Sequence, residues 1–296
     1  MAEPILTLTD ARLTLNGNAG PVDILHGISL EVRAGETLGL IGPSGAGKTF
    51  LIQTAALYAM CRGLKVILTS FTSERARALG GIHLHQLFPI EVRPVKAVNP
   101  DIMTGNTIKT LKMTQTKKMV LLQRTDIFVI EEMGVISAEQ FAMVDTVMKV
   151  IMGNSQSFGG KLIIANGDPL QLPPIEGKPF WTSIHLGPMF DVRMLKHYVR
   201  AAEDQNLQRV LGCMRLPTIP PDCIEECIGL ISENAKFPSA WEDVPEYAMR
   251  IVSTRKAEGE VIRQFLEKKI QDPNVSVQTY NAVDEVYDQL RWKPAT

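Results

Sequence analysis

The residues with the clearest chemical meaning form an eight-residue loop at positions 42–49. Its sequence, Gly-Pro-Ser-Gly-Ala-Gly-Lys-Thr, fits the phosphate-binding pattern G-x-x-x-x-G-K-[ST] at every position. Glycines let backbone N–H groups curl around phosphates, and the helix that follows offers its positive N-terminus. In this pattern Lys48 reaches the outer phosphates of a nucleoside triphosphate, and the Thr49 hydroxyl binds Mg²⁺. The predicted nucleotide site therefore comprises Gly42, Pro43, Ser44, Gly45, Ala46, Gly47, Lys48 and Thr49.

Two adjacent carboxylates, Glu131 and Glu132, follow the apolar run at 128–130. ATPases with a phosphate-binding loop place one acid near Mg²⁺ and a second near the attacking water at such a strand end. We therefore expect Glu131 at the metal and Glu132 at the water. The first acid is usually Asp, and the extra methylene of Glu131 pushes its carboxylate farther from the metal. The alternative is two glutamates that are merely exposed at the end of a strand.

A third polar turn, residues 166–174, follows the apolar run at 162–165. Gly167 permits a sharp turn, and the later prolines stiffen the segment after it. Asp168 and Gln171 are thereby placed at the carboxyl end of a strand, where ligands bind in open α/β sheets.

The pattern of elements predicts how these groups are positioned. We expect strands at 5–8, 28–32, 37–41, 65–69, 127–130, 162–165 and 250–254, and helices from residue 50 and at 73–79, 108–124, 138–152 and 258–269. Residues 16–20 read as a turn and residues 89–107 as irregular. Strands that alternate with helices predict βαβ units and a mostly parallel sheet with helices on both faces, an α/β fold. Ser73 is expected to cap its helix.

Composition describes an ordinary soluble protein of one large or two modest domains. The chain has 296 residues, 45% of them hydrophobic and 21% charged, with a net charge of −1. No global field points to nucleic acid or membrane, although a local basic groove would suffice for DNA. The lysine-rich stretch at 108–124 is either such a surface or a solvated helix face. The N-terminus lacks a secretory pattern, and no apolar stretch approaches about twenty residues, so we expect a soluble intracellular protein.

The four cysteines, Cys61, Cys213, Cys223 and Cys227, contain no C-x-x-C pair. We expect reduced, partly buried thiols, with a zinc site as the less favoured alternative.

Three segments, in this order and spacing, resemble motifs I, II and III of PIF-type and RecD-like superfamily 1 DNA helicases. They are the loop, the two glutamates and the Gly-Asp-x-x-Gln-Leu-Pro-Pro block at 167–174. Residues 69–88, with Gly-Gly-Ile-His-Leu-His at 80–85, resemble the segment between motifs I and II. Residues 195–200 resemble the family's L-x-x-N-x-R. The resemblance covers roughly residues 42–270, with His83 in place of a Thr and Tyr198 in place of an Asn.

This resemblance implies a RecA-like P-loop fold and an ATP-dependent DNA helicase, or its N-terminal motor fragment, that acts on single-stranded DNA. It implies that Gln171 senses the γ-phosphate and that Arg200 stabilises charge in the transition state, beside Lys48, Glu131 and Glu132 as catalytic residues. ATP and Mg²⁺ are the implied cofactors. By the same resemblance His85 and Phe88 are candidates for stacking on DNA bases. The alternative for Phe88 is a place in the core.

The start of the chain differs from this family. The glutamine-containing adenine motif is absent, and residues 1–49, especially 24–45, resemble the opening of an ABC-transporter ATPase domain. We therefore expect an ABC-like β lead segment at 1–41, a RecA-like ATPase domain at 42–215, and a linker with an incomplete second RecA-like domain at 216–296. Two alternatives stay open. One is an ABC-type ATPase with a membrane partner, although no L-S-G-G-Q precedes the paired acids. The other is a catalytically weak nucleotide-binding fragment.

Overall fold

A computed structural model describes residues 4–17, 20–90, 100–199, 201, 203–234, 251–271, 276, 285–287 and 292–294. The chain divides into two compact units, Met1–Glu233 and Asn234–Thr296. The first unit carries every motif that has chemical meaning, and each unit is described by itself.

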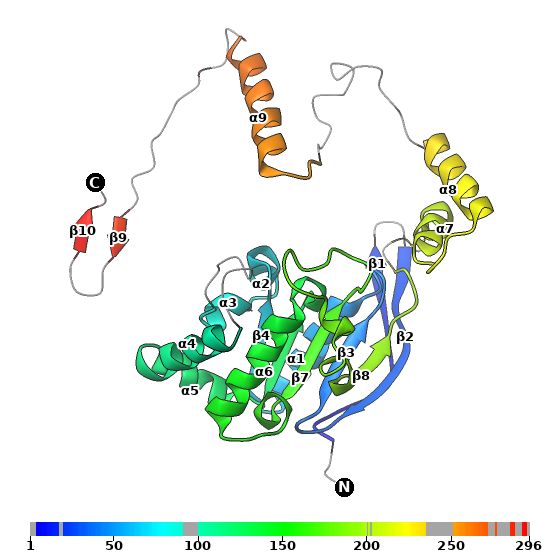
Figure 1. Ribbon diagram of the computed structural model, residues 1–296. Helices are drawn as coiled ribbons and strands as arrows, with labels where there is room; N and C mark the ends of the chain where they lie inside the picture. The colour runs from blue at the N-terminus through cyan, green and yellow to red at the C-terminus, as the bar shows by residue number, and fades with distance from the viewer. Residues whose placement is uncertain are drawn as a thin grey trace. The chain divides into compact units, whose positions relative to one another are not determined.

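A six-stranded sheet forms the centre of the first unit (Figure 1). Its order is β5 (Ile82–His83), β4 (Val66–Ser70), β6 (Ile127–Glu131), β7 (Leu162–Gly167), β3 (Thr37–Ile41) and β8 (Asp191–Met194). Every neighbouring pair is parallel. The strands β6 and β7 are buried along their whole length, as parallel strands covered on both faces must be.

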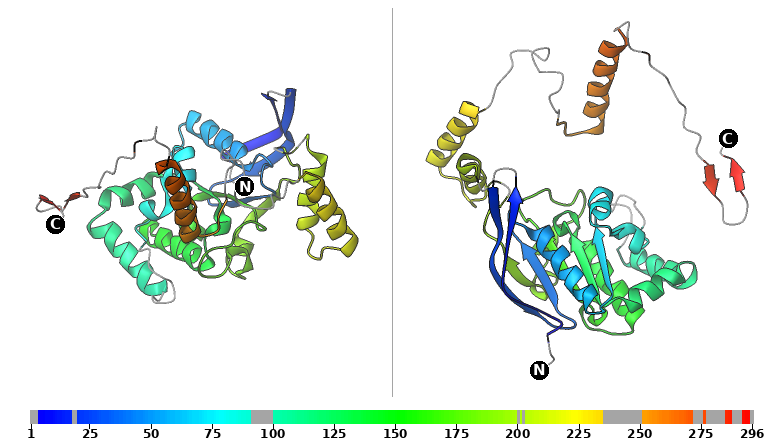
Figure 2. Two further views of the ribbon diagram at one scale, coloured as in Figure 1. Left: turned by 90° about the horizontal axis from the view of Figure 1, so that it is seen from above. Right: turned by 180° about the vertical axis from the view of Figure 1, so that it is seen from behind.

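Alternate residues of the central strands feed two separate cores. Phe128 and Ile130 of β6 pack with α6 (Ala138–Met152), whereas Ile127 and Val129 pack with α1 (Lys48–Cys61). Side chains of a strand point alternately to opposite faces, so one short apolar run supplies both cores. The views from the front and from behind show α6 and α1 over opposite faces of the sheet (Figures 1 and 2).

Helix α6 matches its predicted bounds because both of its ends carry strong local signals. Ser137 and Gln140 form a reciprocal capping box at the start, and Gly153 ends the helix in the left-handed conformation at φ 62°. Its buried stripe centres on Phe141, which is 1% exposed. The same core includes residues of α4 (Pro100–Met113) and α5 (Thr116–Arg124).

The chain begins with a long antiparallel hairpin of β1 (Leu6–Gly17) and β2 (Gly20–Val32), which is a sheet of its own. Leu6, Leu30 and Val32 at its base are buried in the core that also contains α1. Among the described residues of this unit, the remaining short elements are α2 (Ser73–Ala78), α3 (Leu84–Leu87) and 3₁₀ turns at Met133–Val135, Ser157–Gly160, Phe180–Thr182 and Gly187–Met189.

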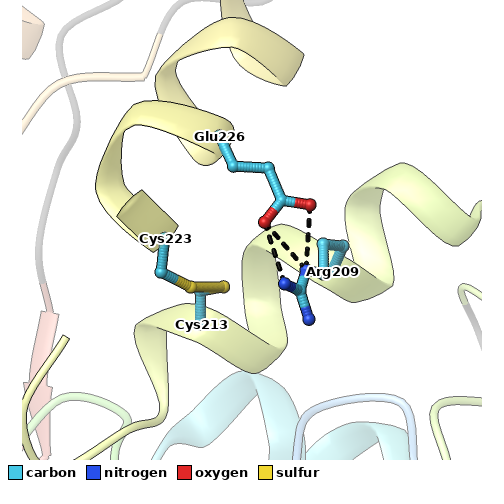
Figure 3. Close-up of a disulfide and its surroundings, with 4 residues drawn as sticks. All are labelled: Arg209, Cys213, Cys223 and Glu226. Atoms are coloured by element: carbon cyan, nitrogen blue, oxygen red, sulfur yellow. Dashed lines mark hydrogen bonds and ion pairs between the residues drawn. A yellow bond between two sulfur atoms is a disulfide. The ribbon is translucent and has the colours of Figure 1, made fainter. Parts of the chain in front are cut away.

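Two helices, α7 (Gln205–Met214) and α8 (Pro221–Asn234), follow β8. A disulfide joins Cys213 of α7 to Cys223 of α8 (Figure 3), so the expectation of reduced thiols is wrong for this pair. Cys61 and Cys227 are free. The sequence could not show this pairing, because it depends on the way the two helices face each other.

The second unit contains α9 (Arg255–Ile270) and an antiparallel pair of short strands, β9 (Glu285–Tyr287) and β10 (Trp292–Pro294). Within the described part of the chain, no helix is both long enough and apolar enough to cross a membrane.

Four expectations about local structure are corrected. The predicted helix at 108–124 is two helices, because α4 ends where the N–H groups of Thr114 and Gln115 both bond the Thr110 carbonyl. Residues 100–107 belong to α4 rather than to an irregular segment, while 91–99 lie outside the described residues. Residues 251–254 form no strand, because Thr254 instead caps α9 through the Ala257 N–H.

The predicted cap of α2 is also displaced by one residue, since its N-cap is Thr72 rather than Ser73.

Candidate nucleotide-binding and hydrolysis site

The three motif-bearing strands are consecutive in the sheet, in the order β6, β7, β3. Because these strands are parallel, their carboxyl ends meet at one edge. A cleft of about 930 Å³ lies there, and its lining includes Lys48, Thr49, Glu131, Glu132, Asp168 and Gln171. Residues more than a hundred positions apart in the chain thus share one cavity.

The phosphate-binding loop connects β3 to α1 through backbone conformations that favour glycine. Gly42 has φ 152°, and a Cβ there would collide with the carbonyl oxygen of Leu195. Gly47, the N-cap of α1, is left-handed at φ 83°. Among the described residues no side chain caps the start of α1 by a hydrogen bond, and none in its first turn is acidic. The N–H groups at the positive end of the helix therefore face the cleft without a side-chain cap.

Lys48 lies over the loop that precedes it. Its Nζ donates to the carbonyl oxygens of Gly42 at 2.7 Å and Pro43 at 2.8 Å. Both contacts are to neutral oxygens, so an anion in the loop would be a stronger partner for the ammonium group.

Glu131 and Thr49 meet directly. Glu131 ends β6 and is 2% exposed, and its Oε1 accepts a hydrogen bond from the Thr49 hydroxyl. Its other oxygen, Oε2, is buried, and no described residue makes a hydrogen bond to it. A buried carboxylate oxygen without a partner is costly, and a cation beside it would remove that cost. A hydroxyl with a carboxylate is the hard oxygen donor set that Mg²⁺ prefers, so these residues fit the metal. The longer Glu side chain still reaches Thr49.

Burial raises the pKa of the Glu131 carboxyl, and the hydrogen bond from Thr49 and the charge of Arg75 only partly oppose this effect. The ionised form of Glu131 is therefore disfavoured in the metal-free protein.

Glu132 adopts the left-handed conformation at φ 56°, which is uncommon for a residue with a side chain. Its carboxylate pairs with Arg75 of α2, with Nε and Oε1 3.1 Å apart. Its backbone N–H donates to Asn166 Oδ1 on β7 at 3.2 Å. The acid expected to activate water is therefore fixed from two sides at the wall of the cleft.

Asp168 is held by an arginine that the sequence did not indicate. The guanidinium of Arg215 donates to both carboxylate oxygens, at 2.8 and 2.9 Å. The side chain of Asp168 is 3% exposed and that of Arg215 28%. Burial alone would raise the pKa of Asp168, but the hydrogen bonds from Arg215 and from the Leu170 N–H outweigh it and the pKa is lowered. Because Asp168 also accepts from the Gln171 N–H at its carbonyl, this pair fixes the turn that carries Gln171.

The segment after β8 lies against the loop. The N–H of Leu195 donates to the Ile41 carbonyl at 2.8 Å, and that of Val199 to the Gly45 carbonyl at 2.9 Å. Val199 lines the cleft. Arg200, the expected arginine finger, lies outside the described residues.

The two candidates for DNA stacking differ in exposure. Phe88 is 2% exposed within the core of α4, α5 and α6, so its ring is not available to a base and its core alternative applies. His85 is half-buried, with its ring 4.9 Å from that of Phe71 and 5.3 Å from that of His83. Burial lowers the pKa of His85, and the charge of His83 acts in the same direction.

Comparison with known proteins agrees with this arrangement. The sequence profile described as PIF1-like helicase matches residues 22–200, more than half of the chain. The chain belongs to the PIF1-like helicase family. The match spans the loop, both glutamates, the Gln171 turn and Arg200, as the resemblance of the motifs implied.

Individual PIF1-like relatives match only part of their length. The ATP-dependent DNA helicase Pif1 of Psychrobacter sp. (strain PRwf-1) is 28% identical over 144 residues, which cover 49% of this chain and 21% of the relative. A second similarity is to the lipoprotein-releasing system ATP-binding protein LolD of Hyphomonas neptunium (strain ATCC 15444), 35% identical over 100 residues, 30% of this chain and 44% of the relative. The chain thus spans less than half the length of these relatives.

Solved structures of PIF1-like helicases share the fold. The crystal structure of Pif1 helicase from Candida albicans has a TM-score of 0.65 at 20% identity and covers 86% of this chain and 56% of its own. Pif1 from Bacteroides, in complex with ADP-AlF3 and ssDNA, has a TM-score of 0.60 at 18% identity and covers 86% and 57%. The expected P-loop, RecA-like fold is confirmed.

Sequence reasoning missed two arginines, Arg75 and Arg215, that contact predicted site residues. Each contacts a predicted motif residue, but each stands in an ordinary helical sequence. A basic residue at a helix end was the only available signal, and many residues share it.

Replacing Arg215 tests whether the pair with Asp168 stabilises the site. We expect Arg215→Ala to lower the free energy of unfolding by about 2–3 kcal/mol at pH 7, because it leaves a buried carboxylate without its partner. The folded-state pKa of Asp168 is lowered, so this stabilisation is present above its unfolded value of about 3.9 and is lost as pH falls through the folded value. Urea unfolding at pH 7 and pH 3 measures both effects.

Arg209→Ala, which removes an exposed ion pair from the same helix, is the matched control and should change little. Equal losses in the two variants would contradict the assignment.

The buried charge of Glu131 makes a prediction of opposite sign. Since its folded-state pKa lies above the unfolded value of about 4.3, wild-type stability falls as pH rises through that window. Glu131→Gln should therefore stabilise the metal-free protein at pH 8, and the gain should vanish as pH falls below the unfolded value. Thermal unfolding in EDTA across this range measures it. The exposed Glu74→Gln is the control, and a Glu131→Gln variant that is less stable at pH 8 would refute the argument.

Proposed function

We propose that this chain is the nucleotide-hydrolysing motor, or its N-terminal part, of an ATP-dependent DNA helicase of the PIF1 type. The observation that carries the proposal is the convergence of the loop, Glu131, Glu132 and Gln171 in one cleft at the carboxyl edge of the sheet. Membership of the PIF1-like helicase family supports it.

Binding of ATP begins with the loop and Lys48. The backbone N–H groups at the start of α1 receive the phosphates, and the ammonium of Lys48 moves from the Gly42 and Pro43 carbonyls to the outer phosphate oxygens. This exchange replaces neutral acceptors by charged ones, so it favours the triphosphate.

Thr49 and Glu131 are the residues that would hold Mg²⁺. The ion supplies charge neutralisation for the phosphates when it is bound. A cation held there would give the buried Oε2 of Glu131 a partner and would offset the burial that raises its pKa in the metal-free protein. Metal and nucleotide binding are thereby coupled to the relief of an unfavourable charge.

Glu132 orients and polarises the attacking water. Its ion pair with Arg75 holds the carboxylate at the wall of the cleft. Arg75 is a positioning residue in this scheme, because it acts on the water through Glu132.

Gln171 reports the presence of the γ-phosphate, and Arg200 stabilises charge as the bond to that phosphate breaks. The Asp168–Arg215 pair holds the turn of Gln171 in place, and Val199 lies at the loop immediately before Arg200. Loss of the γ-phosphate would therefore remove a contact of Gln171 and so act directly on the turn after β7.

The partner we propose is single-stranded DNA. The Bacteroides Pif1 structure described with ADP-AlF3 and ssDNA supports both the nucleotide and the DNA. Of the two stacking candidates, only His85 retains exposure, at one end of the sheet beside Phe71. The site of action is then a DNA-containing compartment inside the cell.

An ABC-type ATPase is the second candidate, because of the similarity to LolD. Its partner would be a membrane protein, and its turnover would be indifferent to DNA. The proposed helicase motor should hydrolyse ATP faster with an oligonucleotide, and a weak nucleotide-binding fragment should show no turnover under either condition. Titration of ATP turnover with single-stranded DNA separates all three.

Replacing Lys48 tests the nucleotide site. We expect Lys48→Ala to reduce kcat for ATP hydrolysis by about 10²–10³-fold, because one fixed positive charge is lost from the transition state. Circular dichroism should show an unchanged fold, and the exposed Lys256→Ala is the matched control. Turnover at the wild-type level in Lys48→Ala would discard the assignment of the cleft.

Replacing Gln171 tests coupling rather than binding. Gln171→Ala should leave the affinity for ATP near the wild-type value but reduce stimulation of turnover by single-stranded DNA roughly tenfold, which is about 1.4 kcal/mol. ATP affinity and turnover with and without an oligonucleotide are the measurements. Gln205→Ala, an exposed glutamine on α7 away from the cleft, is the control. If stimulation persists in Gln171→Ala, the residue has no part in coupling.

A further inference from the structure

Three cysteine sulfurs lie together between α7 and α8, outside the cleft. Cys213 comes from the end of α7, and Cys223 and Cys227 are one turn apart on the same side of α8. The three sulfur atoms all lie within 4.8 Å of one another. Two of them form the disulfide drawn in Figure 3, and the third is a free thiol beside it.

The cluster is shielded from solvent. Cys213 is 4% exposed, Cys223 is 7% exposed, and Cys227 is half-buried. A second link joins the same two helices alongside the sulfurs, since Arg209 donates to both carboxylate oxygens of Glu226 at 2.9–3.1 Å (Figure 3). The helices thus also meet through an exposed ion pair that does not depend on the disulfide.

We propose that Cys213, Cys223 and Cys227, when reduced, form a binding site for a thiophilic divalent cation, with Zn²⁺ as the natural occupant. Thiolates bind Zn²⁺ at about 2.3 Å in tetrahedral geometry, which places their sulfurs roughly 3.8 Å apart. The observed sulfurs all lie within 4.8 Å of one another, so small side-chain movements after reduction would bring them to this spacing. Three protein donors leave a fourth coordination position for water or an external ligand.

The disulfide and the metal site are alternative states of the same residues. Glutathione disulfide is a sufficient oxidant: the Cys213 and Cys223 thiolates give up two electrons to it and form the observed bond. The oxidant takes up these two electrons together with two protons from the solvent and leaves as two molecules of glutathione. The cation loses two of its three ligands and is released, and Cys227 remains a thiol. The inference does not depend on the function proposed for the cleft.

Cobalt serves as the probe, because thiolate-bound Co²⁺ absorbs in the near ultraviolet and tetrahedral Co²⁺ has intense visible bands. The full chain, reduced and kept under argon, should bind one equivalent of Co²⁺ with both signatures, and Zn²⁺ should displace it. Addition of glutathione disulfide should abolish the bands in step with the appearance of the Cys213–Cys223 cross-linked peptide in mass spectra. A reduced chain that shows no sulfur-to-cobalt band overturns the proposal.

Single cysteine variants locate the site. Cys227→Ser, which leaves the disulfide pair intact, should weaken Co²⁺ binding at least about 100-fold. Cys61→Ser replaces the exposed cysteine of α1 and should bind as the wild type does. Far-ultraviolet circular dichroism of each variant confirms folding, and Cys213→Ser adds a second ligand test. Unchanged binding in a folded Cys227→Ser variant would show that the three sulfurs are not one site.

Discussion

The parallel register of β6, β7 and β3 is the constraint on which the rest of the structure depends. Each strand ends in a different functional group: Glu131 on β6, the Asp168 turn after β7, and the phosphate-binding loop after β3. Parallel pairing points all three ends the same way, and consecutive positions in the sheet bring them into one cleft. An antiparallel reversal of one strand would send its polar end to the opposite edge. The alternating burial of these strands in two cores therefore maintains the site, because a slip of one residue would exchange the two faces.

The two buried carboxylates of this site, Asp168 and Glu131, differ in how well they are paired. Asp168 has an arginine on both of its oxygens, and its turn is fixed before any ligand arrives. Glu131 accepts a hydrogen bond from the Thr49 hydroxyl, but its buried Oε2 makes no hydrogen bond to a described residue and its pKa is raised. The two acids therefore differ in how they are satisfied: the Asp168 carboxylate is paired within the chain, whereas the Glu131 carboxylate is buried and makes fewer hydrogen bonds. Sites that keep such a poorly satisfied carboxylate commonly use it in function.

The parts of this site that sequence could predict are those coded by local pattern. The spacing of glycines identifies the loop, the end of an apolar strand identifies the two glutamates, and a capping box marks the start of α6. Each of these signals is contained within a few consecutive residues. Arg215 could not be predicted, because its partner is 47 positions away and the contact depends on where the tertiary fold places the end of α7. The Cys213–Cys223 bond depends on the same helix placement. The break between α4 and α5 was missed because two carbonyl contacts of Thr110, rather than a proline or glycine, end the first helix.

The N-terminal segment that resembles an ABC-transporter ATPase and the helicase-like part of the chain share one hydrophobic core. The base of the hairpin, which belongs to the ABC-like stretch, buries Leu6, Leu30 and Val32 against α1 and the central strands. Full burial of each such side chain contributes about 1.5–3 kcal/mol of transfer free energy, so the hairpin is tied to the body by several kcal/mol. The strand β3 then continues from this core into the loop, and it pairs with β7 and β8 on either side. Removal of the hairpin would therefore expose one face of α1 and loosen the helix whose N-terminus must hold the phosphates. The hairpin of β1 and β2 is therefore part of the structure that positions the nucleotide site.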